Sequence, residues 1–159
     1  MSNGSIQNID KLMKKLQKLN IDSKQELKQS MERNIKMVQG EAKLLCPVDT
    51  GSLRNSIVTN VKETSKGIEA KVSTHYEIAP YVEFGTGRKG EESGGDKYPG
   101  PLSYKQDKWK VNIPDVGVRW TEGQPAQPFM YPALKNNEEL VKKNIASDLE
   151  KKIREVAGR

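Results

Sequence analysis

The sequence predicts an α+β fold with two N-terminal helices, an antiparallel β-meander with a long hairpin-bearing insertion, and a C-terminal helix packed on the sheet. Three observations lead to this fold class. Apolar residues recur every three or four positions over residues 5–45 and 134–156, which indicates amphipathic helices. They alternate with polar residues over residues 68–74, which indicates a half-buried strand. A stretch rich in glycine and proline, residues 88–123, separates the strands from the last helix.

Two helices are expected before the first strand. The first covers residues 5–19, whose apolar residues share one face, and it is expected to end at Asn20 to Asp22. Ser23 begins a capping-box pattern, with a glutamate three residues later, so a second helix should start there. Pro47 is expected to stop the second helix, because proline has no backbone N–H to donate.

Three short strands are expected to form the meander. Residues 55–63 and 68–74 are predicted to pair as a hairpin, with a turn at Ser65 to Gly67. The stretch Tyr81 to Phe84 is predicted to be the third strand. Alternation within the sheet would place Ile68 and its apolar neighbours on the side that the helices cover.

The insertion contains a hairpin pattern of its own. Residues 109–113 and 116–120 both alternate, and Pro114-Asp115 can turn the chain between them. We therefore expect a projecting hairpin, preceded by a mobile stretch at residues 91–101.

The last helix completes one domain. Apolar residues from Leu134 to Val156 share a face, and Pro132 suits a first helical turn. At this length we expect a single domain over residues 1–159, with residues 1–22 as an N-terminal helical extension and residues 88–123 as a flexible insertion or arm.

The formal net charge of +6 is concentrated in the segments predicted to be helical at the two ends. A lysine-rich helix face is usually solvated, but it could also favour nucleic acid or an acidic partner. The chain has no apolar run long enough for a membrane span and no apolar signal-peptide core, so we expect no membrane contact and residence in the cytoplasm where it is made.

The chain offers few residues for catalysis or metal binding. One cysteine, Cys46, excludes an internal disulfide and a multi-cysteine metal site, and one histidine, His75, excludes a two-histidine zinc site. Glu83 and Asp49 could be imagined as a carboxylate pair for acid–base chemistry, but no pattern places them together. We therefore expect no catalytic residue, no metal and no cofactor.

The run "PYVEFGTGRKG", Pro80 to Gly90, satisfies G-x-G-x-x-G. A dinucleotide-binding loop needs a helix that opens at the glycines, and the following "EESGGDKYPGP" is not expected to open one. The alternative is a strand end at which Gly85 and Gly87 supply positive φ angles. That alternative accounts for the glycines, but it does not explain why Tyr81, Glu83 and Phe84 precede them.

Three motifs stand in order: "AKLLCPVDTGSLRNSI", "YEIAPYVEFGTG" and "QPAQPFMYPAL". Together they resemble a family of small morphogenesis proteins of long-tailed phages, named after the tenth gene product of a lambda-like coliphage. The resemblance covers about residues 27–157, although the insertion is longer and richer in tryptophan than the family pattern needs. Its motif residues are expected to shape the scaffold, with the Asp49 side chain bonding backbone amides and Phe129 and Leu134 set into the core. The residues assigned to this structural role are Pro47, Asp49, Thr50, Gly51, Leu53, Tyr81, Glu83, Phe84, Gly85, Thr86, Gly87, Pro125, Pro128, Phe129 and Pro132.

The resemblance implies a structural virion-assembly protein of a phage or prophage. Such proteins form a homo-oligomeric ring in the neck or tail-completion position at the head–tail junction, beside neighbouring neck or tail proteins, after assembly in the host cytoplasm. Trp109 and Trp120 are candidate subunit contacts, although both could instead pack the hairpin onto its own domain. DNA would pass through the ring, and we expect no specific DNA binding. A basic nucleic-acid-binding module is the alternative, and a tail-associated hydrolase is a third hypothesis with little chemistry available to it.

Overall fold

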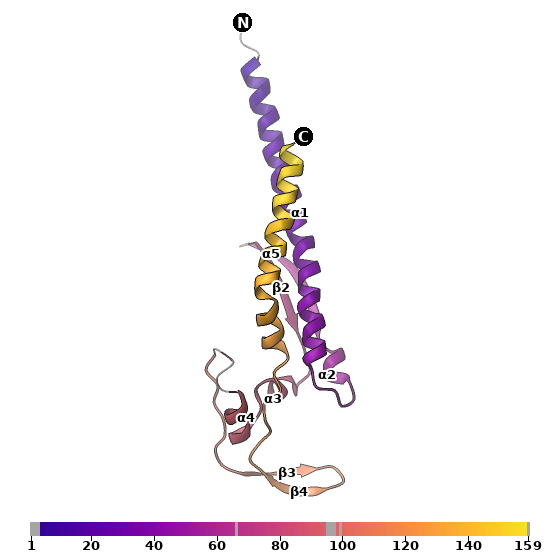
Figure 1. Ribbon diagram of the computed structural model, residues 1–159, viewed down its shortest axis with the longest axis vertical. Helices are drawn as coiled ribbons and strands as arrows, with labels where there is room; N and C mark the ends of the chain where they lie inside the picture. Colours follow the sequence, from indigo (N-terminus) through magenta and orange to yellow (C-terminus); the bar gives the residue numbers. More distant parts are fainter. Residues whose placement is uncertain (1–3, 66, 95–97, 99, 159) are drawn as a thin grey trace. The chain divides into compact units, whose positions relative to one another are not determined.

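The computed structural model describes residues 4–65, 67–94, 98 and 100–158, with the side chains of residues 4–16 outside this description. The described residues form helices and two separate two-stranded antiparallel sheets, so the predicted α+β class is confirmed (Figure 1). No helix within these ranges combines the length and apolar character that a bilayer crossing would need.

The chain divides into two compact units. Unit 1 contains the described residues of 4–37, 59–71 and 137–158, and unit 2 contains those of 38–58 and 72–136. The elements appear in the order α1, α2, β1, β2, α3, α4, β3, β4 and α5.

The first helix, α1, runs without a break from Gly4 to Leu45. The predicted interruption at Asn20 to Asp22, and with it the capping box at Ser23, is therefore wrong. These residues are only weak helix formers, each costing a fraction of a kcal/mol, and a long helix absorbs them when no glycine or proline is present. Pro47 follows the helix end as predicted, and the second helix before the sheet is the short α2, Ser52–Asn55.

Gly40 is an exposed glycine inside α1, and a Cβ built there meets no atom within 4 Å. Replacing Gly40 with alanine should therefore raise the free energy of unfolding by about 0.5–1 kcal/mol, because alanine loses less backbone entropy in a helix. Urea unfolding followed by circular dichroism measures this change. A lower free energy of unfolding for Gly40→Ala would mean that the space around this position is not open.

The first sheet matches the predicted hairpin. Strands β1, Val58–Thr64, and β2, Gly67–Ser73, pair with each other. Ile68, Ala70 and Val72 are half-buried, whereas Glu69 and Lys71 are exposed, so the predicted alternation along β2 is confirmed.

The segment after β2 is helical, which overturns two predictions. Residues Ala79–Phe84 form the helix α3 where a third strand was expected, and Pro80 lies in its first turn. A second helix, α4, covers Gly87–Gly94, although the sequence after the glycines was not expected to open a helix. Proline tolerates a first turn because its missing N–H has no helical partner there.

The insertion contains the predicted hairpin. Strands β3, Trp109–Ile113, and β4, Gly117–Thr121, are antiparallel, and residues 114–116 form the turn with Asp115 at a φ of 63°. The last helix, α5, runs from Met130 to Ala157, with Pro132 in its first turn as predicted. Part of the stretch expected to be mobile, residues 95–97 and 99, lies outside the described residues.

A polar cluster joins α1 and α5 within unit 1. Ser30 Oγ and Arg33 Nη2 donate to a carboxylate oxygen of Asp148 at 2.6 and 2.8 Å. The buried Asn34 side chain accepts from Asn144 Nδ2 at 2.8 Å and donates to the Ser30 carbonyl. Since buried polar groups must be paired, this cluster fixes which residues of the two helices face each other.

The hydrogen bond from Ser30, and then the one from Arg33, hold the pKa of Asp148 below its usual range. A depressed pKa in the folded state stabilises the fold above the ordinary aspartate value of about 3.9, and this contribution disappears as the pH falls through the lower, folded value. Asp148→Asn should therefore cost up to about 1 kcal/mol at pH 7. Its free energy of unfolding should also fall less on acidification than that of the parent protein.

Urea midpoints measured between pH 7 and pH 2 test this pH dependence. Asp22→Asn is a suitable control because Asp22 lies on α1, one of the two helices that form the cluster, but outside the cluster itself. Parallel curves for the parent and Asp148→Asn over the whole range would contradict the prediction.

Candidate functional site

The first motif forms the loop between α1 and α2. Gly51 has a φ of 83°, which glycine adopts without strain, and it precedes the first residue of α2. Thr50 Oγ1 accepts a hydrogen bond from the Ser52 backbone N–H at 3.3 Å. The side-chain hydrogen bond to a backbone amide that was predicted for Asp49 is therefore made by Thr50. The Asp49 side chain is exposed. Leu53 is buried as expected, although it lies in α2 rather than at the start of the sheet.

Glu83 connects the second motif to the third. The residue is only 6% exposed, and its carboxylate accepts backbone hydrogen bonds from Phe129 at 2.7 Å, Met130 at 2.8 Å and Tyr131 at 2.9 Å. These N–H groups lie at the start of α5, where a helix has unpaired donors and a partial positive charge. Glu83 therefore caps α5 from a distant part of the sequence, and both of its oxygens are occupied.

The glycines after α3 allow two chain segments to cross in contact. Thr86 and Gln124 exchange backbone hydrogen bonds at 2.9 and 3.1 Å. A Cβ on Gly87 would lie 2.2 Å from the Glu122 carbonyl oxygen, and one on Gly123 would lie 1.8 Å from that of Thr86. A Cβ on Gly85, which has a φ of 71°, would lie 2.7 Å from the Gln124 carbonyl oxygen. The G-x-G-x-x-G pattern is therefore explained by close backbone packing, beyond the predicted positive φ angles.

Further contacts hold the third motif against α3 and α4. The Gln127 N–H donates to the Val82 carbonyl at 2.8 Å, and the Ala126 N–H donates to Ser93 Oγ at 2.6 Å. Gln124 Nε2 donates to the Tyr81 carbonyl at 2.9 Å. These hydrogen bonds, with the one that Phe129 donates to Glu83, span 33 to 46 residues of sequence and form one joint, which we call the Glu83 joint: residues 81–93 and 122–131.

Aromatic packing surrounds this joint. Phe129 is 0% exposed, as predicted, whereas Leu134 is 55% exposed, so the prediction that Leu134 enters the core is wrong. The Phe84 ring packs edge-on against Tyr98, with ring centroids 4.8 Å apart. The remaining motif residues lie nearer the surface: Tyr81 and Pro125 are exposed, and Pro128 and Pro132 are half-buried.

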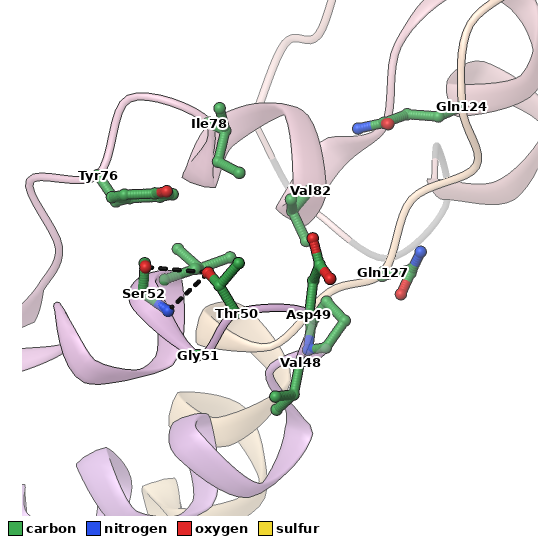
Figure 2. A pocket seen from close by; sticks show the side chains of 12 residues that line it. Val48, Asp49, Thr50, Gly51, Ser52, Tyr76, Ile78, Val82, Gln124 and Gln127 are labelled. Carbon is green, nitrogen blue, oxygen red and sulfur yellow. Dashed lines mark hydrogen bonds between the residues drawn. The ribbon is translucent and has the colours of Figure 1, made fainter. Parts of the chain in front are cut away.

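A hollow of about 330 Å³ opens beside the joint in unit 2. Figure 2 shows Tyr76, Ile78 and Val82 on one side of it and the loop from Val48 to Ser52 on the other. The residues that line the hollow come from all three motifs. They are Pro47, Val48, Asp49, Thr50, Gly51, Ser52, Leu53, Tyr76, Ile78, Val82, Gln124 and Gln127.

The two tryptophans have different surroundings. Trp109 is half-buried, with Cη2 2.8 Å from the position of a Cβ on Gly87, so it packs onto its own unit. Trp120 is 65% exposed, and Lys110 Nζ lies 5.2 Å from its ring centroid. Of the two candidate subunit contacts, Trp120 has the accessible side chain.

The described residues offer a limited set of reactive groups. Among them, no group of three or more His, Cys, Asp or Glu side chains is placed to hold a metal ion. Burial raises the pKa of the Cys46 thiol, which disfavours the thiolate needed for nucleophilic attack. The imagined acid–base role of Glu83 is incompatible with its three backbone hydrogen bonds.

Comparison with protein families gives one match. Residues 10–85 match the family described as "HK97-gp10_like: Bacteriophage HK97-gp10, putative tail-component". This range contains the whole first motif and most of the second. Comparisons with curated proteins and with solved structures gave no match. The predicted resemblance is therefore confirmed over residues 10–85, which carry the pattern of the HK97-gp10-like family of phage proteins.

Proposed function

We propose that this protein is a structural component of a phage or prophage virion, assembled as a homo-oligomeric ring at the head–tail junction in the neck or tail-completion position. The family match supports a tail component. The position at the junction is our own assignment, and the observation that carries it is the Glu83 joint. This joint fastens the two ends of the insertion to the helical scaffold, leaving the β3–β4 hairpin as a surface for assembly.

The joint suits a building block better than an enzyme. Its carboxylate, its glycines and its buried aromatic ring are all used in backbone capping or close packing. Such an arrangement makes a rigid support, and rigid supports reduce the entropy lost when subunits associate. Neighbouring neck or tail proteins would be the other partners of the ring.

DNA would pass through the ring without specific binding. Several exposed lysines already have acidic partners: Lys24 and Lys28 with Glu63, Lys62 with Glu69, and Lys108 with Glu122. Such pairing reduces the phosphate affinity that a dedicated nucleic-acid surface needs. Purified protein should therefore cause no shift of DNA mobility in low salt.

Shortening the hairpin tests the proposed function. Replacing residues 110–120 with Asn-Gly keeps the facing pair Trp109 and Thr121 and the ion pair of Lys108 with Glu122. The shortened protein should fold, but it should not complement a phage that lacks the gene. Electron microscopy of the resulting lysate should show unjoined heads and tails.

Gly40→Ala provides a control for expression in the same phage, because this change lies in α1 and outside the joint. Normal virions that lack the protein altogether would overturn the proposed function. Normal virions that contain the shortened protein would show that assembly does not need the hairpin.

A further inference from the structure

The two faces of the β3–β4 hairpin differ: Trp109, Val111 and Thr121 on one face are half-buried, whereas the other face is bare. The strand register places Trp120 opposite Lys110 and Val118 opposite Asn112, so these four side chains share a face. On that face Trp120 is 65% and Val118 57% exposed, whereas Trp109, on the other face, packs beside Gly87. An exposed tryptophan next to an exposed valine is typical of an interface, where tryptophan often contributes much of the binding energy.

The hollow beside the joint has matching properties. Val48 and Ile78 at its rim are 59% and 49% exposed, so apolar surface is available to a partner side chain. The Asp49 carboxylate lines the same hollow (Figure 2). On the hairpin, the Lys110 ammonium lies 5.2 Å from the Trp120 ring centroid, so an apolar ring and a cation are presented together. The hollow offers apolar walls and a carboxylate together.

We propose that the bare hairpin face of one copy docks into this hollow on a second copy of the same chain, with Trp120 against Val48 and Ile78, and Lys110 beside Asp49. This contact rests on the proposed ring. Both surfaces belong to unit 2, and Trp120 is exposed, so this tryptophan does not fill the hollow of its own chain. A contact between two different patches is head-to-tail and can close into a ring, whereas a self-complementary patch would stop at a dimer.

The size of the contact predicts how it behaves. One tryptophan buries about 150–250 Å², and stable protein interfaces bury about 1,200–2,000 Å² in total. A single hairpin contact is therefore weak alone, so the protein should be monomeric when dilute. Closure of the ring would stabilise the contact, because the final subunit binds on two sides at once.

Cysteine cross-linking of the full-length protein tests this contact. In a Cys46→Ala background, Val118→Cys combined with Ile78→Cys keeps Trp120, Val48, Lys110 and Asp49, and it should give a ladder of covalent oligomers on mild oxidation at high protein concentration. Val118→Cys alone and Ile78→Cys alone should give little product. Circular dichroism checks that each variant is folded, and the same oxidation is applied to assembled particles carrying the pair.

A charge exchange gives a second measurement. Lys110→Glu should reduce the yield of the ladder about tenfold, and Asp49→Lys added to it should restore the yield. Lys105→Glu is a matched control, because Lys105 lies over Trp109 rather than Trp120, and it should leave the yield unchanged.

The outcomes separate this inference from the proposed function. The absence of a ladder in both concentrated protein and particles would overturn the hairpin contact, even if the protein proves essential for joining heads to tails. Dimers from Val118→Cys alone, at the yield of the pair, would also overturn it in favour of hairpin-to-hairpin pairing. A ladder from a protein absent from virions would support the contact while rejecting the proposed function.

Discussion

Replacing Glu83 with alanine should lower the free energy of unfolding by about 3 kcal/mol, because it removes a helix cap and leaves a buried donor unpaired. The carboxylate accepts three backbone N–H groups at the start of α5, and that of Phe129 belongs to a fully buried residue. Glu83→Gln should cost less, about 2 kcal/mol, since its amide oxygen can still accept while its NH₂ faces the remaining donors.

Urea unfolding measures both changes, and hydrogen exchange at Phe129, Met130 and Tyr131 shows whether the cap itself is lost. Glu92→Ala is the matched control, because Glu92 is an exposed carboxylate on the adjacent helix α4. Its effect should stay within about 0.5 kcal/mol. Equal stabilities of Glu83→Ala and Glu92→Ala would mean that the carboxylate does not hold the joint.

The regular elements were largely predictable because their patterns are local. The alternation of β2 and the paired alternation around Pro114-Asp115 correspond to strands, and the apolar stripe after Pro132 corresponds to α5. Such patterns depend on which face of an element is buried, and this information is present within a few neighbouring residues.

The wrong predictions concern short segments whose conformation depends on tertiary contacts. The stretch Tyr81 to Phe84 is apolar enough for a strand, but its helical form brings Glu83 to the start of α5. Four residues are too few for periodicity to distinguish a strand from a helix. At Asn20 to Asp22 the weak helix formers are tolerated because the flanking residues continue α1 on both sides.

The joint was only partly predictable. Glu83, the glycines after it and Phe129 were predicted to be structural, but Gly123, Gln124 and the partner of Glu83 were not. One signal was available: no Ser, Thr, Asp or Asn occurs in "QPAQPFM", so α5 has no local side chain to cap it. A buried helix start without a local cap requires an acceptor from elsewhere. A carboxylate in the preceding motif is the natural candidate, although sequence alone cannot give the distance between them.

Replacing Gly123 with alanine should have the largest effect of all, a loss of about 4 kcal/mol in the free energy of unfolding. The new Cβ would lie 1.8 Å from the Thr86 carbonyl oxygen and 2.9 Å from the Gly87 nitrogen, so backbone rather than a flexible side chain would have to move. The φ of 101° adds strain for any residue with a Cβ. The paired hydrogen bonds between Thr86 and Gln124 would break as the two segments separate.

Gly117→Ala distinguishes crowding from backbone strain. Gly117 also has a positive φ, 85°, but a Cβ there meets no atom within 4 Å, so alanine should cost only about 1–2 kcal/mol. Amide exchange at Thr86 and Gln124 should accelerate in Gly123→Ala and stay slow in Gly117→Ala. If both variants lost the same stability and kept this protection, the crossing would not be close-packed. The glycines of the second motif would then be needed only for their positive φ angles, as the sequence first suggested.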